Sequence, residues 1–231
     1  IKARIRGLQS HGQPRDTVQP GSRCAVNLQN IEVAELSRGD IIAKTDAILS
    51  TRTADVQIAW LSSAPEVEGT VSIEFLSGTA ERRARLAPIA CEGFAPGEKA
   101  FARLHIDGDP VPLMLGDRFI ARGFARSTGT GGTLGGGVIL DIAPPHRRRS
   151  DPSLARELEI FAGDDIDSGI RERVLRTGMT GAAEPDLAIE MGLFAKELSA
   201  RLAKLEADGT LVRAGGKRWI GGEIIARMEA R

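Results

Sequence analysis

Six glycines between Thr128 and Val138 are the first candidates for chemistry, within FARSTGTGGTLGGGVILD at residues 124–141. A phosphate-binding loop has the pattern G-x-x-x-x-G-K-[ST], because its lysine must reach the terminal phosphates. No lysine occurs between Lys99 and Lys196. A dinucleotide-binding loop would need a helix after the glycines, whereas an apolar strand-like run follows here. The pattern therefore favours backbone roles, in a left-handed turn or in close strand packing.

Serine, histidine and cysteine give no strong catalytic pattern. Ser127 lies in no G-x-S-x-G elbow. The histidines are scattered, and we expect His105 to be a structural strand residue rather than a base. Cys24 and Cys91 form no C-x-x-C pair, so we expect two buried, reduced thiols in a cytoplasmic protein. The acidic run at residues 164–167 suits a helix N-terminus better than a calcium loop. We expect neither a catalytic residue nor a metal site.

Composition indicates a soluble globular chain of two or three modules. It has 231 residues, of which 42% are hydrophobic and 27% are charged, and its net charge is zero. Residues 1–150 hold 19 basic against 16 acidic residues, and residues 151–231 hold 12 against 15. No apolar run approaches the roughly 18 residues of a membrane span. The start, IKARIRGLQ, lacks Met and alternates like a strand, so we expect a fragment that begins inside a domain.

The first two-thirds of the chain have the period of β structure. Apolar residues alternate in DVQIAW (residues 55–60) and TVSIEF (residues 70–75), as in antiparallel strands with one buried face. Further short strands are separated by loops rich in Gly, Pro and Asp, which predicts a barrel or a sandwich. APPHRRRSDPS (residues 143–153) is the clearest boundary, since its prolines interrupt regular structure.

After this boundary the period becomes helical. Leu198, Leu202 and Leu205 form the stripe of the strongest helix, and a Gly-Gly turn then separates two strands of a predicted hairpin. We also expect Ser168 to cap an earlier helix. Helix, short helix, longer helix and hairpin form the order of a winged helix-turn-helix domain.

A winged helix raises the possibility of nucleic-acid contact. Lys196, Arg201 and Lys204 lie on its third helix, and Lys217 and Arg218 lie on its wing. Acidic residues share the same helix, whereas nucleic-acid readers concentrate positive charge on one face. A role as a spacer or a protein contact is at least as well supported.

Two stretches resemble the SelB family of selenocysteine-specific translation elongation factors. RIRGLQSHGQPRDTVQPGSRCAVNLQNIEVAELSRGDII (residues 4–42) is similar to the second half of the family's β-barrel domain II. PLMLGDRFIARGFARSTGTGGTLGGGVILD (residues 112–141) is similar to the end of domain III, although the link STGTGGT is longer than usual. The motifs PGSR-x-AVNL and RGD, followed in this order by GDRF and GGGV, are specific in combination. The resemblance covers nearly the whole chain.

The resemblance implies a mainly β plus α fold, with translation-factor-type antiparallel β-barrels followed by a winged helix-turn-helix domain. We expect a partial barrel over residues 1–47, a complete barrel over 48–145 and the winged helix over 146–231. The family delivers selenocysteyl-tRNA to the ribosome as a cytoplasmic GTPase. GTP and Mg²⁺ are implied for a G domain that this chain lacks, and a selenoprotein mRNA hairpin is implied for later winged helices. No membrane partner is expected.

The resemblance also implies site residues. Arg38 matches an arginine of the family's selenocysteyl pocket, with a simple turn residue as the alternative. Arg118, Arg122 and Arg126 lie on or beside the strand that resembles the tRNA-facing strand, where contacts to phosphates would position the tRNA without reading its sequence. Structural salt bridges are an equal alternative for these arginines.

Two rival functions lead to different expectations. A transcription regulator with a β sensing domain should have a basic recognition helix and should bind duplex DNA tightly. An enzyme that uses the glycine stretch should have titratable groups around residues 127–137.

Overall fold

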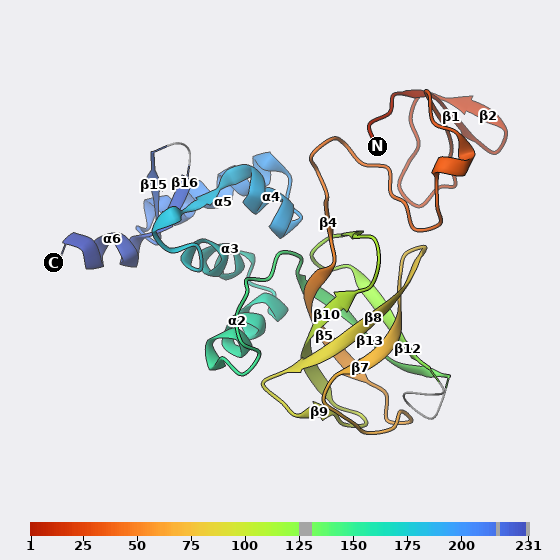
Figure 1. Ribbon diagram of the computed structural model, residues 1–231. Coiled ribbons are helices and arrows are strands. Elements are labelled where there is room, and N and C mark those ends of the chain that lie inside the picture. Colours follow the sequence, from red (N-terminus) through yellow and green to blue (C-terminus); the bar gives the residue numbers. More distant parts are fainter. Residues whose placement is uncertain (125–130, 216–217, 230–231) are drawn as a thin grey trace. The chain divides into compact units, whose positions relative to one another are not determined.

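The computed structural model describes residues 1–124, 131–215 and 218–229. It divides into two compact units, residues 1–40 and residues 41–231 (Figure 1). The domain boundaries expected after residues 47 and 145 stay predictions.

The N-terminal unit is a small open sheet of three antiparallel strands in the order β2-β1-β3. Its elements are β1 Ile5–Ser10, β2 Gln13–Arg15, β3 Ala25–Leu28 and the 3₁₀ helix η1 Val33–Glu35. His11 and Gly12 join β1 to β2 with φ angles of 52° and 73°, as a tight hairpin turn requires. No hydrophobic side chain in residues 1–40 is fully buried, so this sheet has no core of its own.

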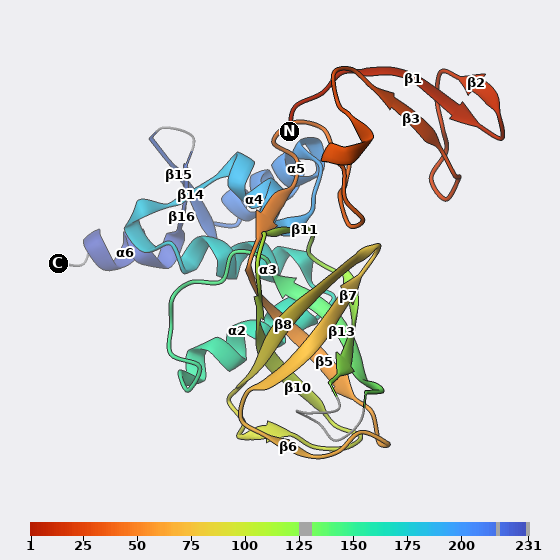
Figure 2. The ribbon, with the colours of Figure 1, turned by 45° about the vertical axis from the view of Figure 1, so that its right-hand side comes forward.

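The second unit contains a closed antiparallel barrel in the order β10-β5-β13-β12-β7-β8 (Figure 2). Its strands are β5 Thr53–Trp60, β7 Val71–Ser77, β8 Ala80–Ile89, β10 Lys99–Ile106, β12 Arg118–Gly123 and β13 Thr133–Asp141. Two short pairs flank it: β4 Leu49–Thr51 with β11 Val111–Leu113, and β6 Val67–Glu68 with β9 Gly93–Phe94. The alternation seen in residues 55–60 and 70–75 is confirmed, because Val56, Ile58, Ile73 and Phe75 are all completely buried.

The glycines of LGGGVILD allow close strand packing inside this barrel. A Cβ atom on Gly135 would lie 2.5 Å from the carbonyl oxygen of Ala59. A Cβ atom on Gly137 would lie 2.0 Å from the carbonyl oxygen of Gln57 and 2.8 Å from the ring of Phe119. Only glycine fits at such distances, so the backbone role expected for this half of the glycine stretch is confirmed.

Residues 152–229 form what we call the helical module. It contains α2 Pro152–Ala162, α3 Ile166–Leu175, η2 Gly178–Thr180, β14 Ala182–Ala183, α4 Glu184–Met191, α5 Ala195–Ala207, β15 Leu211–Ala214, β16 Arg218–Gly221 and α6 Gly222–Glu229. From α3 onward this is the order of a winged helix, and β14, β16 and β15 form its sheet. The predicted stripe of Leu198, Leu202 and Leu205 lies in its core with Trp219.

Helix α2 packs elsewhere, on the outside of the barrel (Figures 1 and 2). Leu154, Leu158 and Phe161 of α2 form an apolar cluster with Ile89 of β8 and Leu140 of β13. We call the barrel surface around Ile89 and Leu140, on which the helical module packs, the covered face.

Two sequence expectations are wrong. The cap of α3 is Asp165, whose carboxylate accepts hydrogen bonds from the backbone N–H groups of Asp167 and Ser168, so Ser168 lies inside the helix. Cys24 and Cys91 are both free but exposed, because neither lies at an inward-facing position of a core strand.

No helix in the described part of the chain is both long and apolar enough to cross a bilayer.

Candidate RNA-contacting surface

The outer surface of β12, β7 and β8 is open and carries several arginines. Strand alternation turns every second side chain into the core and leaves the others outside. Arg118 and Arg122 of β12 are exposed, as are Arg83 and Arg85 of β8. On β7, which lies between these strands, Glu74 is opposite both Arg122 and Arg83. We call these four arginines the open arginine face.

The arginines of this face have weak partners. Arg122 forms a 3.0 Å ion pair with Glu74, and Arg85 lies 3.8 Å from the carboxylate of Asp107. The guanidinium of Arg83 lies 5.9 Å from the centroid of the Phe124 ring. Exposed ion pairs contribute only about 0–1 kcal/mol, so these groups can exchange their partners for phosphate at little cost.

His105 borders the open arginine face, opposite Arg85 in the β10–β8 register. It is half-buried in its strand, and the structural role expected for it stays a prediction. Burial lowers the pKa of His105, and the positive charges of Arg85, Arg103 and Arg149 lower it further. The imidazole is therefore neutral near pH 7 and adds no charge to the surface. Within the described residues, no three His, Cys, Asp or Glu side chains are grouped as a metal site would need.

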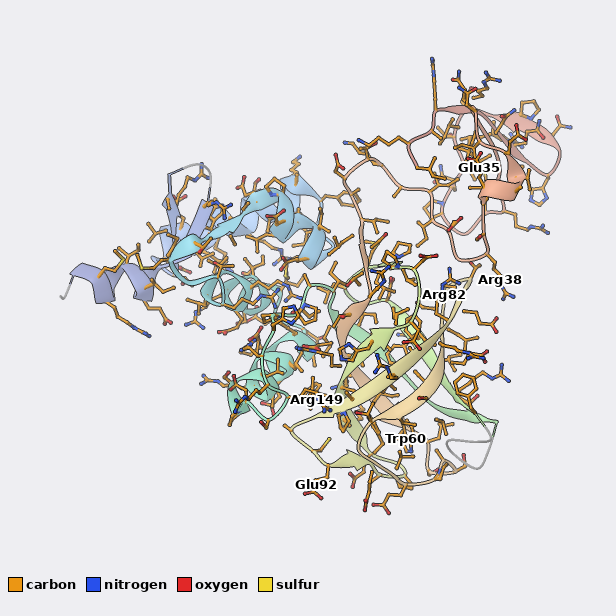
Figure 3. All side chains as sticks on the ribbon, viewed as in Figure 1. Glu35, Arg38, Trp60, Arg82, Glu92 and Arg149 are labelled. Carbon is orange, nitrogen blue, oxygen red and sulfur yellow. The ribbon has the colours of Figure 1, made fainter. Side chains whose placement is uncertain are left out.

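Arg38 lies exposed in the turn that follows η1 (Figure 3). The backbone N–H of Ser37 donates a 2.7 Å hydrogen bond to the carboxylate of Asp40, and the backbone N–H of Asp40 donates to the carbonyl oxygen of Ser37. The SRGD sequence thus forms a locally stabilised turn that presents the arginine.

The basic residues of the winged helix are largely occupied within the helical module. Arg201 donates a 2.8 Å hydrogen bond to Asp167 of α3, and Lys204 donates another of 2.8 Å to the same carboxylate. These two hydrogen bonds lower the pKa of Asp167, with that from Lys204 the larger effect. Arg218 donates to the carbonyl oxygen of Gly181. Lys196 is exposed on the first turn of α5.

Three predicted features lie outside the described residues, in part or in full. They are Arg126, Lys217 and most of the STGTGGT link. Of the predicted residues that the structure describes, Arg118 and Arg122 lie together on β12 of the barrel. The helical module carries the others: Lys196, Arg201, Lys204 and Arg218.

Sequence reasoning missed Arg83 and Arg85. Their signal is the alternation in ERRARL, where Ala84 and Leu86 are buried and the two arginines between and beside them are exposed. Placing them beside Arg122 requires the pairing of β7 with both β8 and β12, which the sequence does not state.

Comparison with known proteins agrees with the motif resemblance. No family model matches the chain. The chain is 30% identical over 220 residues to the selenocysteine-specific elongation factor of Desulfomicrobium baculatum. That similarity covers 94% of this chain and 32% of the relative's length. The expected resemblance is thereby confirmed: nearly all of this chain is similar to about a third of a selenocysteine-specific elongation factor.

Proposed function

We propose that the chain is a part of a selenocysteine-specific elongation factor that helps to deliver selenocysteyl-tRNA to the ribosome. The observation that carries the proposal is the 30% identity over 94% of the chain. The barrel supplies a surface for the tRNA, and the helical module connects the barrel to the parts of the factor that bind mRNA.

The open arginine face is the proposed tRNA contact. Guanidinium groups form forked hydrogen bonds with phosphate oxygens, and such contacts fix the position of an RNA without reading its sequence. Arg83 and Arg85 extend the contact from Arg118 and Arg122 across β7. Arg38 is the proposed residue of the selenocysteyl pocket, where its charge would offset that of the selenolate.

Catalysis is assigned to another part of the factor. GTP and Mg²⁺ would bind a G domain, and a selenoprotein mRNA hairpin would bind later winged helices. The whole factor would be cytoplasmic. The purified chain should therefore not hydrolyse GTP above background, and measured turnover would contradict this assignment.

The tRNA contact is tested by measuring binding of tRNA to the 231-residue chain over a range of salt concentrations. A variant with Arg83, Arg85, Arg118 and Arg122 all changed to Gln removes the open arginine face. We expect its affinity for tRNA at low salt to fall about tenfold or more. The slope of log K against log salt should decrease by about 0.7–0.9 for each phosphate group that the variant no longer binds.

A matched control changes Arg148, Arg156, Arg171 and Arg227 to Gln. All four lie outside the open arginine face, and the change in net charge is the same. Equal decreases in affinity in both variants would mean that only overall charge matters and would contradict a defined tRNA surface.

The transcription-regulator alternative is not favoured. Its recognition helix would present free basic residues, whereas Arg201 and Lys204 on α5 both bond to Asp167. A gel-shift with random duplex DNA distinguishes the two, since strong, salt-sensitive retention would favour the regulator.

A further inference from the structure

Charged side chains from four elements lie together, buried or partly buried, where the barrel meets the helical module. Asp141 comes from β13 of the barrel, Glu157 from α2 and Glu190 from α4. Arg173 comes from α3, and Arg176 caps the C-terminus of that helix. We call these five residues the interface cluster.

Arg176 joins the three carboxylates of the cluster. It donates one hydrogen bond to Asp141 of the barrel, one of 2.8 Å to Glu190 and one of 3.4 Å to Glu157. Burial alone would lower the pKa of Arg176, but the three carboxylates outweigh this effect and raise the pKa. One guanidinium thus links the barrel to α2, α3 and α4, which makes Arg176 the centre of the cluster.

Arg173 adds a second connection from α3. Its side chain is 1% exposed and donates a 2.8 Å hydrogen bond to the backbone carbonyl of Leu140. The guanidinium also lies 3.9 Å from the centroid of the Phe161 ring of α2. Among the described residues the Nε atom of Arg173 has no hydrogen-bond partner, but it lies 3.7 Å from the carboxylate of Glu190. A buried ion pair of this kind adds little net stability but requires a defined geometry.

The apolar and ionic parts of this interface act differently. Apolar contacts such as those of Leu154 and Leu158 with the barrel are non-directional and tolerate small shifts. Forked guanidinium–carboxylate bonds hold only at defined angles and distances. Buried ion pairs add little net stability compared with apolar groups, but removing one partner leaves an uncompensated charge.

We propose that the interface cluster locks the helical module in one orientation on the barrel, so that the two move as one body. Modules within a chain ordinarily move relative to each other unless the interface is large and apolar. Here the lock is ionic, and Arg176 is its central residue. A force or ligand that displaces the helical module would therefore displace the barrel with it.

The test is a distance distribution between two spin labels on the full 231-residue chain. Cys91 is a native exposed thiol next to β8, and Ser199 is exposed on α5. Changing Cys24 to Ser and Ser199 to Cys gives one label on each side of the interface. We expect a single narrow distribution. Arg176→Met should widen it about twofold or more, because the modules then sample several orientations.

Two further variants complete the experiment. Arg176→Lys retains the charge but loses the fork, and should widen the distribution by a smaller amount. Arg122→Met removes an ion pair of the barrel outside the interface and should leave the width unchanged. Hydrogen exchange of β5 and β7 peptides verifies that each variant keeps a folded barrel.

A broad distribution in the parent protein would overturn the proposal, as would a width that does not change in a folded Arg176→Met variant. If Arg176→Met does not fold, the Arg176→Lys result decides, and an unchanged width there would contradict the lock.

Discussion

The covered face and the open arginine face lie on the same barrel but use arginine in different ways. On the covered face, Arg103 of β10 forms two hydrogen bonds with Asp55 of β5, at 2.7 and 2.8 Å, and the two side chains are 8% and 1% exposed. On the open face, Arg122 pairs with Glu74 at 3.0 Å, with side chains 48% and 25% exposed. The guanidinium–carboxylate distances are thus similar, although one pair is buried and the other is exposed to water.

This contrast shows that burial determines what an ion pair does. Burial raises the pKa of Asp55 even though Arg103 lowers it, so desolvation is the larger effect on this carboxyl group. Removing one partner of the buried pair is therefore strongly destabilising. The open pairs are screened by water, and their arginines are available for another anion.

The largest expected effect comes from breaking the covered pair. Arg103→Met leaves the carboxylate of Asp55 buried without its partner and should lower the free energy of unfolding by about 3–5 kcal/mol. Urea unfolding measures the change.

Arg85→Met is the matched change on the open side, where the pair with Asp107 spans 3.8 Å between half-exposed side chains. It should cost less than about 1 kcal/mol. Equal costs for the two substitutions would contradict the distinction between the faces.

A further substitution tests the closed barrel on which both faces depend. Gly137→Ala places a methyl group 2.0 Å from the carbonyl oxygen of Gln57, so β13 and β5 must separate. We expect the free energy of unfolding to fall by about 1–3 kcal/mol. Gly131→Ala is the control, since among the described residues no atom beyond its chain neighbours lies within 4 Å of its Cβ position. Urea midpoints that fall equally would show that close strand approach is not the reason for this glycine.

The partly exposed ionic contacts of Asp167 with Lys204 and Arg201 are expected to make a small, pH-dependent contribution to the free energy of unfolding. Hydrogen bonds from Lys204 and Arg201 lower the folded-state pKa of Asp167 below the ordinary value of 3.8. The stabilisation is therefore present above pH 3.8 and is lost as the pH falls through the lower folded-state pKa. Asp167→Asn should cost about 1 kcal/mol or less at pH 7.

The cost of Asp167→Asn, measured by urea unfolding, should be constant from neutral pH to about pH 5 and should shrink below about pH 4. A cost that grows on acidification would have the wrong sign.

The smallest expected change concerns stability on the open face. Arg83→Gln combined with Arg118→Gln should alter the free energy of unfolding by no more than about 0.5 kcal/mol, because neither side chain is buried. Its tRNA affinity should nevertheless fall. A large decrease in stability would show that these side chains are structural, which is the alternative that the sequence left open for Arg118.

Local patterns determined much of the architecture. Strict alternation placed Val56, Ile58, Ile73 and Phe75 in the barrel core, because a strand sends every second side chain to one face. The leucine stripe of α5 and the hairpin after it predicted the winged helix for the corresponding reason. These features depend on neighbours in sequence.

Tertiary structure alone decided the roles of the arginines. Arg103 and Arg173 look no different in the sequence from Arg83 and Arg85, yet the first two are buried and the last two are exposed. The difference arises because α2 packs on Ile89, Phe101 and Leu140, and α3 donates a hydrogen bond to Leu140, whereas β12 and β7 stay open. These contacts join segments far apart in the chain. Sequence period can state which side of a strand a residue occupies, but only the packed fold decides whether that side meets water.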